Sequence, residues 1–391
     1  MNYRNVALCL AIALLGSMAF RLQMPAVSFY ARYVLQSSAF IIGLFTAAFM
    51  LSRAATAVFT GRLYSKKSFA RVAAPIGFLA GSVLAWAFTF LRSVWGFTLL
   101  RVLQGVANGI AWVMVQIVLG ASVEESRRAT VYAIYFSIGI AGVSIANLLY
   151  SVLYTKGFDF LMTLSSALFL CVAALSSLLR PPRAEPAAAR GRGASGGAVA
   201  TSFKLCIVPL AIIFLTQIAI ALPGSGVVYV YMKEVFGLSK SLTTRIVAIA
   251  LAISIAMGIG LSYVADRVSE RRALATAVAL LIAGCAVIPL RILWLATVAF
   301  AALLSSARAT ISIVRRIAMR LLGARGIGYV NAAGNLGFVV GSLTMGVAYD
   351  RLGPSSLDGV IVESALVPYA PLTAVFVGML RAVMKYFGRG K

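Results

Sequence analysis

Four arginines lie inside long apolar stretches of the sequence, at Arg21, Arg53, Arg101 and Arg308. A charged residue inside a lipid-spanning segment costs about 2.5–3.5 kcal/mol on insertion scales, so each is a candidate for function. The guanidinium group stays charged at any relevant pH, and its planar fork of donors matches the oxygens of a carboxylate or phosphate. This residue type therefore favours the binding of an anion.

The ten acidic residues, Glu234 and Asp350 among them, lie in predicted loops or near the ends of apolar stretches, and the chain has no histidine. Proton-coupled carriers usually need a buried Asp, Glu or His that titrates, and the sequence places none in the middle of a span. A cavity with several arginines and no carboxylate should attract an anion, because opposite charges about 4 Å apart gain roughly 4 kcal/mol at an effective dielectric of 20.

Polar side chains accompany the arginines at helical spacing. Gln104 and Asn108 follow Arg101 at intervals of three and four residues, which places all three on one face of a helix. Gln217 precedes a Pro-Gly-Ser-Gly stretch at 223–226 that is typical of a broken helix. The candidate substrate-binding residues are Arg21, Arg101, Gln104, Asn108, Gln217 and Arg308.

Structural roles compete with binding for several of these residues. Arg101 can hydrogen-bond neighbouring helices whatever the cargo, and Gln and Asn side chains often join helices in membranes. Arg53 lies near the expected end of its helix, so we interpret it as structural. Arg315 can belong to a basic rim at the end of its helix. The stretch at 223–226 can be a tolerated kink instead of a binding element.

The composition indicates which elements must hold these residues. Of 391 residues, 61% are hydrophobic and 12% are charged, against about 25% charged in soluble proteins. A net charge of +25 would by itself suggest a nucleic-acid-binding protein, but here short basic clusters separate apolar runs long enough to cross about 30 Å of hydrocarbon. We therefore expect an all-α polytopic membrane protein that contacts lipid and binds no nucleic acid.

The cysteines carry no metal-binding pattern. Cys9, Cys171, Cys206 and Cys285 are far apart, form no C-x-x-C pair and have no histidine to complete a zinc site. We expect them to be packing residues, and we expect no metal and no cofactor.

Twelve apolar runs of helical length fall into two groups of six. The first group covers 6–34, 39–61, 71–91, 94–121, 130–154 and 159–179. The second group covers 203–232, 243–264, 273–290, 293–322, 327–349 and 364–387. The segment between the groups is rich in Pro, Gly, Ala and Arg, which predicts a flexible linker. The predicted organisation is a six-helix bundle at 1–179, a linker at 180–202 and a second six-helix bundle at 203–391.

The basic residues are distributed unevenly between the two ends of these spans. With the amino terminus inside, about 23 Lys and Arg residues fall on that side and about 8 on the other. Basic loops are retained on the cytoplasmic side, so both termini and the linker should be cytoplasmic in a plasma-membrane protein. The apolar run after Asn5 resembles a secretory signal, but it lacks a convincing cleavage site and we interpret it as the first helix.

The two groups of spans share features in the same order. Gly139 and Gly142 of the fifth run recur as Gly334 and Gly337 of the eleventh, at an offset of about 195 residues. Pro25 of the first run has a counterpart in the seventh, within 223–226. Many transporters are built from two related halves, and weak self-similarity of this kind indicates such a repeat.

Three stretches resemble motifs of one family. Arg101, Gln104 and Gly105 match an R-x-x-Q-G pattern on the fourth helix, and Gly334 to Gly353 is similar to an eleventh helix and its outer turn. The loop after the second run keeps the glycine and basic residues of a G-x-x-x-D-[RK] motif but has Ser65 in place of the acid. With these motifs the chain resembles the major facilitator superfamily (MFS) of secondary transporters over nearly its whole length.

The resemblance implies an MFS fold of two pseudo-symmetric six-helix bundles, with helices 1, 4, 7 and 10 lining a central cavity. It also implies a charge network at the cytoplasmic helix ends that forms and breaks as the two halves rock. The implied gating residues are Gly61, Lys66, Asp266, Arg267 and Arg271. The proline-containing glycine motif that drug antiporters carry on helix 5 is not found at 139–144, which argues against a multidrug antiporter.

We expect a monomeric secondary transporter that moves a small solute by alternating access, with a bias towards an organic or inorganic anion. Export of amphipathic compounds or drugs through the same fold is the alternative. A membrane-embedded enzyme acting on lipid is disfavoured, because the sequence shows no paired acidic residues near a membrane face, and we expect no enzymatic activity. A sensor without turnover is disfavoured because no signalling domain is appended.

Overall fold

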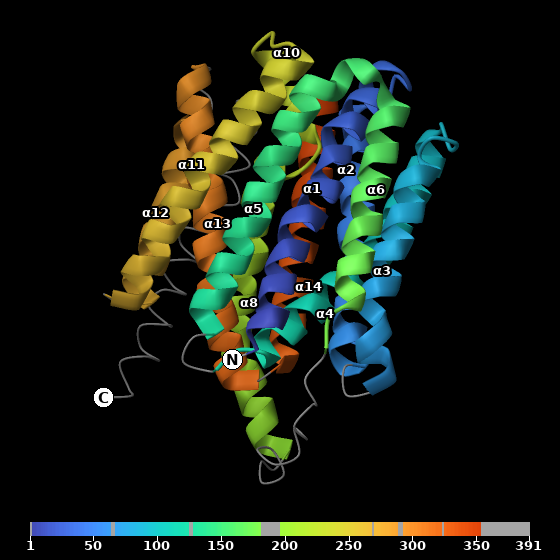
Figure 1. The fold of residues 1–391 in the computed structure, drawn as a ribbon. Coiled ribbons are helices and arrows are strands. Elements are labelled where there is room, and N and C mark those ends of the chain that lie inside the picture. The colour runs from blue at the N-terminus through green and yellow to red at the C-terminus, as the bar shows by residue number, and fades with distance from the viewer. Residues whose placement is uncertain are drawn as a thin grey trace.

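The computed structural model describes residues 2–63, 67–124, 128–180, 196–267, 270–287, 292–322 and 324–352. Long helices run side by side through these residues (Figure 1). The first half contains α1 (Tyr3–Tyr33), α2 (Ala39–Leu63), α3 (Lys67–Ala87), α4 (Val94–Ala121), α5 (Arg128–Leu153) and α6 (Phe158–Ser177). The second half contains α8 (Gly196–Ala219), α9 (Ala221–Gly224), α10 (Val227–Val235), α11 (Lys240–Arg267), α12 (Glu270–Val287), α13 (Leu293–Leu322) and α14 (Ala324–Leu352).

These helices have the length and composition of membrane spans. Among the described residues, eight are long and apolar enough to cross a bilayer, and three shorter apolar helices occur at Arg71–Ala87, Cys206–Ala219 and Arg272–Gly284. They occupy the runs predicted for the first eleven spans. The predicted twelfth span at 364–387 and most of the predicted linker lie outside the described residues.

The bundle has two ends: we call the end nearest the segment between α6 and α8 the linker end, and the other the opposite end. At the linker end, α1 begins and α4 and α6 end; at the opposite end, α1 passes into α2 and α10 into α11 (Figure 1). Side-chain caps fix helix starts at both ends: Asn2 accepts from the backbone N–H of Asn5, and Ser93 accepts from that of Gly96. The left-handed backbone of Gly157 and Gly237, with φ of 92° and 64°, lets the chain turn at the opposite end.

The seventh predicted span is broken, as the Pro-Gly-Ser-Gly stretch indicates. Its helix ends at Gly224, Ser225 is extended with φ −93° and ψ 177°, and α10 begins at Val227. A side chain at Gly224 would collide with the ring of Phe338, and one at Gly226 would collide with the hydroxyl of Ser28. The two glycines therefore let the broken backbone approach helices of both halves.

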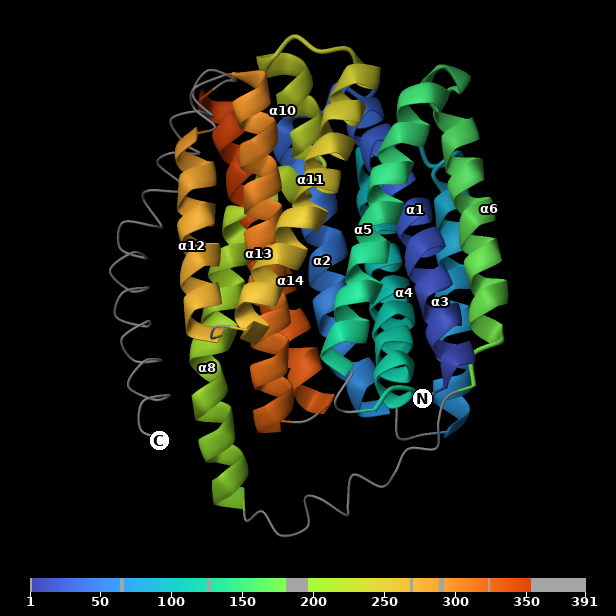
Figure 2. The same ribbon diagram turned by 60° about the vertical axis from the view of Figure 1, so that its left-hand side comes forward.

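The two halves meet along α2 with α14 and along α5 with α11. Figure 2 shows α3, α4 and α6 on one side of this contact and α8, α12 and α13 on the other. Backbones come close enough for glycine only: a Cβ on Gly43 would collide with the carbonyl oxygen of Ser342, and a Cβ on Gly346 would press on Phe40.

The glycine pairs of the predicted repeat make equivalent contacts. Gly142 of α5 packs on the carbonyl oxygen of Leu14 in α1, and Gly337 of α14 packs on the carbonyl oxygen of Phe214 in α8. A Cβ at either position would collide with that oxygen. The fifth span thus packs on the first as the eleventh packs on the seventh, in agreement with the internal repeat.

We expect Gly337→Ala to lower the free energy of unfolding by about 1–3 kcal/mol, because the new methyl group forces the backbones of α8 and α14 apart. The unfolding temperature of the purified protein in detergent measures this. The matched control is Gly258→Ala in α11, where an added Cβ meets nothing within 4 Å. Alanine costs less backbone entropy than glycine in a helix, so the control should be neutral or slightly stabilising. Equal losses in the two variants would contradict the close-approach interpretation.

Candidate functional site

A small cavity lies beside the break between α9 and α10, where helices of both halves meet. Its volume is about 20 Å³, which holds one water molecule. The lining residues come from α1, α2, α4, α9 and the turn before α10: Phe20, Arg21, Met24, Val27, Ser28, Ile42, Phe45, Thr46, Phe49, Met50, Arg101, Gly224 and Gly226. The site is therefore nearly closed in this structure, and a solute needs the halves to separate.

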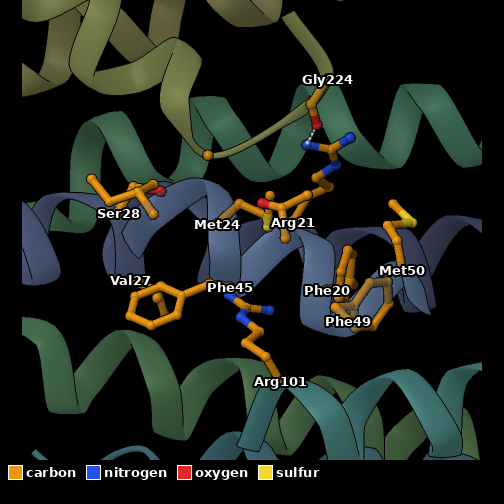
Figure 3. Close-up of a pocket in the computed structure, with 13 residues that line it drawn as sticks. Phe20, Arg21, Met24, Val27, Ser28, Phe45, Phe49, Met50, Arg101 and Gly224 are labelled. Carbon is orange, nitrogen blue, oxygen red and sulfur yellow. Dashed lines mark hydrogen bonds between the residues drawn. The ribbon is translucent and has the colours of Figure 1, made fainter. Parts of the chain in front are cut away.

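Arg21 of α1 connects the two halves at this cavity. Its Nη1 donates to the carbonyl oxygen of Gly224 at 3.2 Å, as the dashed line in Figure 3 marks. The Tyr229 hydroxyl also lies within hydrogen-bonding reach of Arg21 and itself donates to Asn147 Oδ1 at 2.8 Å. Arg21 thus binds only neutral oxygen groups among the described residues.

Arg308 of α13 lies within electrostatic range of Arg21. Its Nη1 donates to the hydroxyl of Ser254 in α11 at 2.7 Å, and Ser305 donates to the Ser254 carbonyl oxygen at 3.1 Å. Arg308 and Arg21 are near enough for mutual electrostatic repulsion. The structure places both Ser305 and Arg308 on the side of α13 that faces α11.

Arg101 of α4 is 3% exposed, and it reaches towards the same cavity in Figure 3. Its Nη1 donates to Gln104 Oε1 at 3.0 Å, and its guanidinium carbon lies 5.4 Å from the ring centroid of Phe88 and 5.9 Å from that of Phe20. It also experiences electrostatic repulsion from Arg21. Arg101 therefore lines the cavity and at the same time joins helices.

A chain of hydrogen bonds fixes the position of Arg101. Gln104 donates to Gln23 Oε1 at 2.8 Å, Gln23 donates to Ser165 Oγ at 2.7 Å, and Ser165 donates to the Ala19 carbonyl oxygen at 2.8 Å. The chain links α4, α1 and α6. Sequence analysis missed Gln23 and Ser165. Gln23 carried a usable signal, because it is an amide in the middle of the first apolar run, two residues after Arg21.

The three guanidinium groups share one electrical environment. Within the described residues, no ion pair or hydrogen bond joins Arg21, Arg101 or Arg308 to a carboxylate. Buried charges are normally paired, because removing them from water is expensive. The arrangement can therefore bind an anion that supplies the missing negative charge.

Two other predicted binding residues do not line this cavity. Asn108 lies one turn beyond Gln104 on α4, and its buried Oδ1 has no hydrogen-bond partner. Gln217 of α8 is 8% exposed and packs near Gly334 of α14. Of the six candidates, the structure brings Arg21 and Arg101 to the cavity wall, with Gln104 and Arg308 beside them.

The predicted gating residues lie outside the part of the chain whose surroundings the structure describes. These are Gly61, Lys66, Asp266, Arg267 and Arg271. Their gating role stays a prediction.

A different charged contact closes the opposite end. Glu234 of α10 accepts from Arg32 of α1 through both carboxylate oxygens, with Nε to Oε1 at 2.9 Å and Nη2 to Oε2 at 3.2 Å. Tyr33 donates to Oε1 at 3.1 Å, and Tyr349 of α14 donates to Oε2. We call these four residues the Glu234 cluster. They join the two halves.

Asp350 makes a second contact between the halves at this end. Its carboxylate accepts from the backbone N–H groups of Ala39 and Phe40, each at 2.8 Å, and so caps the start of α2. Sequence analysis counted Glu234 and Asp350 only as acids near span ends. Their partners are about 200 and 310 residues away in the chain, so local sequence carried no signal for these contacts.

The chain matches the family model of the Major Facilitator Superfamily over residues 8–342. It belongs to this superfamily, has the MFS transporter fold and is an integral, multi-pass membrane protein. The comparison with curated proteins gives no match.

Solved structures of transporters share the fold. A mutant of the nucleoside transporter NupG superposes with a TM-score of 0.76 at 11% sequence identity, covering 96% of this chain and 99% of that one. A second NupG structure gives 0.68 at 13% identity, covering 99% of each chain. A bacterial homologue of the human lysosomal transporter Spinster, inward-facing and occupied, gives 0.67 at 14% identity and covers 92% of this chain and 84% of that one.

We expect Glu234→Gln to lower the free energy of unfolding by about 1.5–3 kcal/mol at pH 7, because a neutral amide loses the charge-assisted bond with Arg32. Burial raises the pKa of the Glu234 carboxyl, but hydrogen bonds from Arg32, Tyr349 and Tyr33 outweigh this and hold the pKa below its ordinary value. The stabilisation is thus complete above the unfolded pKa of about 4.3 and is lost as the pH falls through the folded pKa.

Unfolding temperatures from pH 7 to pH 3 measure this dependence. Below about pH 4.3 the wild-type protein should lose stability more steeply than Glu234→Gln. Asp159→Asn is the control, because Asp159 pairs with Arg92 on the surface, where water screens the charges. Parallel curves for the wild-type protein and Glu234→Gln would show that the carboxylate does not hold this end closed.

Proposed function

We propose that the chain is a secondary transporter that moves a small organic anion across the cell membrane by alternating access. The single observation that carries this is the group of three guanidiniums, Arg21, Arg101 and Arg308, with no carboxylate partner among the described residues. Arg21 repels both Arg101 and Arg308, and a bound anion would offset this repulsion. An opposite charge about 4 Å away gains roughly 4 kcal/mol at an effective dielectric of 20.

The apolar part of the cavity wall supports an organic substrate over an inorganic ion. Phe20 and Phe49 stack with ring centroids 4.7 Å apart, and Met24 and Met50 lie beside them. Methionine side chains adapt to ligands of irregular shape. The substrate that fits both parts of the wall carries a carboxylate or phosphate on an apolar or aromatic body.

The contacts between the halves support a rocking mechanism. Arg21 holds the Gly224 carbonyl oxygen across the cavity, while Glu234 and Asp350 hold the opposite end closed. An anion that binds Arg21 competes with the Gly224 carbonyl and so loosens one of the contacts that join the halves. The moving parts are the bundles at 1–179 and 203–391, joined by the linker at 180–202.

The excess of basic residues at the linker end supports placing that end, and both termini, in the cytoplasm. The opposite end then faces outwards. A single chain supplies both halves of the cavity, so a monomer is sufficient for transport.

A neutral solute fits this site less well. The related folds include a nucleoside transporter, but an uncharged solute would leave the three guanidiniums unneutralised. Export of amphipathic compounds remains the alternative, because the Phe and Met side chains of the wall also suit such cargo.

We expect Arg21→Ala and Arg308→Ala each to reduce exchange of an organic anion in proteoliposomes by roughly 10- to 100-fold, the equivalent of one charge-assisted hydrogen bond. The measurement is uptake of labelled benzoate, succinate, phosphate and uridine by the reconstituted protein. Arg92→Ala removes the same charge from the surface of the first half and should exchange like the wild-type protein.

The pattern across substrates separates the candidate functions. Saturable benzoate or succinate exchange that depends on Arg21 supports the proposal. Anion exchange that is unchanged in both variants, with outward movement of neutral amphipathic dyes, would replace it with the export function.

A further inference from the structure

Two more arginines lie within electrostatic range of each other between the halves, nearer the linker end than the central cavity. Arg53 comes from α2 and Arg315 from α13, and the two are near enough to repel each other electrostatically. Arg315 follows Arg308 by seven residues on α13, which places it on the same face and about 10 Å closer to the linker end. The sequence pattern favours a structural role for Arg53, and a basic rim is one interpretation of Arg315.

Two buried polar atoms of this region, Arg315 Nε and the Tyr135 hydroxyl, have no hydrogen-bond partner. Arg315 donates from Nη2 to Asn331 Oδ1 at 2.7 Å, and its guanidinium carbon lies 4.4 Å from the ring centroid of Phe136, yet its buried Nε has no hydrogen-bond partner. The hydroxyl of Tyr135 in α5 is also buried without a partner, and the residue is 2% exposed. Arg53 forms no hydrogen bond with another described residue.

Tyr135 lies within electrostatic range of both arginines. A buried donor without a hydrogen-bond partner destabilises the folded protein, and two buried like charges without a counter-charge destabilise it further. Arg315 Nη2 has a neutral acceptor in Asn331, but Arg315 Nε and the Tyr135 hydroxyl have none, and an anion would supply both an acceptor and the counter-charge. A carboxylate or phosphate has the oxygens to accept from a guanidinium fork and a hydroxyl together.

The Glu234 cluster shows how a carboxylate can join the two halves of the bundle. At the opposite end a carboxylate of the second half accepts from Arg32 and Tyr33 of the first half and joins the two. At the linker end the arginines and the tyrosine are present, but the described residues supply no carboxylate to them. An anion bound there contacts α2 and α5 of the first half and α13 of the second.

We propose that Arg53, Arg315, Tyr135 and Asn331 form a second anion-binding site between the halves, in which a carboxylate or phosphate from solution joins the linker ends of the two bundles. Ser312 is exposed on α13 between Arg308 and Arg315, so this part of the helix is open to an arriving ligand. The site binds its anion whether or not the central cavity transports one.

A tryptophan beside the site provides a local measurement. The ring of Trp112 in α4 packs edge-on against Tyr135, with centroids 6.4 Å apart. The other tryptophans, Trp86, Trp95 and Trp294, are exposed and can be replaced by phenylalanine. Iodide is an anion and quenches indole fluorescence on contact. Replacing chloride by iodide at constant ionic strength, in the purified full chain with Trp112 as its single tryptophan, reports occupancy of this site.

We expect a saturable quenching component that inorganic phosphate displaces. Arg53→Gln and Arg315→Gln should each weaken the apparent iodide affinity at least tenfold, and Tyr135→Phe should weaken phosphate displacement while leaving the charge unchanged. Arg4→Gln is the matched control at the same end of the bundle, because Arg4 is exposed and, among the described residues, donates to the Leu178 carbonyl oxygen. It should quench like the parent protein.

Two results would overturn the site. One is quenching that rises linearly with iodide and is insensitive to phosphate, which indicates collision without binding. The other is a saturable component that persists in Arg53→Gln, Arg315→Gln and Tyr135→Phe and disappears in Arg21→Gln, which assigns the anion to the central cavity. Tyr135→Phe changes one hydroxyl, so it keeps the test decisive if an arginine variant fails to fold. If transport does not depend on Arg21 but the saturable iodide quenching is retained, the proposed function is rejected and the second site is not.

Discussion

Burial of positive charge without carboxylate partners among the described residues is the constraint on which the rest of this structure depends. A guanidinium group removed from water must find acceptors, and in this chain the acceptors at the centre are a backbone carbonyl, a serine hydroxyl and an amide. Each of these acceptors fixes the position of its arginine. Because all three acceptors are neutral, the centre of the bundle keeps a positive potential that the apolar membrane interior does not screen.

The described carboxylates that join the two halves, those of Glu234 and Asp350, lie at the opposite end, so the contacts between the halves differ between this end and the centre of the bundle. Glu234 and Asp350 reach from the second half to the first and close the opposite end with contacts made by the protein itself. At the centre, Arg21, Arg101 and Arg308 have no carboxylate partner among the described residues. Under the proposed function, a bound anion supplies the negative charge there.

Close contact between helix backbones makes the two bundles rigid enough for their helices to move together. Gly142 on Leu14 and Gly337 on Phe214 hold equivalent helix pairs of the two halves at a distance that a side chain would prevent. The helix break at Ser225 provides the one carbonyl that Arg21 binds across the cavity. Helices this close transmit a displacement at the cavity along their length, because packed interiors are not continuously deformable.

The sequence by itself determined the all-α class, the positions of eleven helices, the break at 223–226 and the embedded arginines, because hydropathy, helical period and Pro or Gly content are local properties of the chain. It placed Arg21, Arg101 and Arg308 on the right helices for the same reason. Only the tertiary structure decided that Gln23 and Ser165 fix Arg101, that Glu234 pairs with Arg32, and that Arg315 lies beside Asn331 and Phe136. These contacts join residues that are tens to hundreds of positions apart, and their partners follow from how helices pack, which no local pattern encodes.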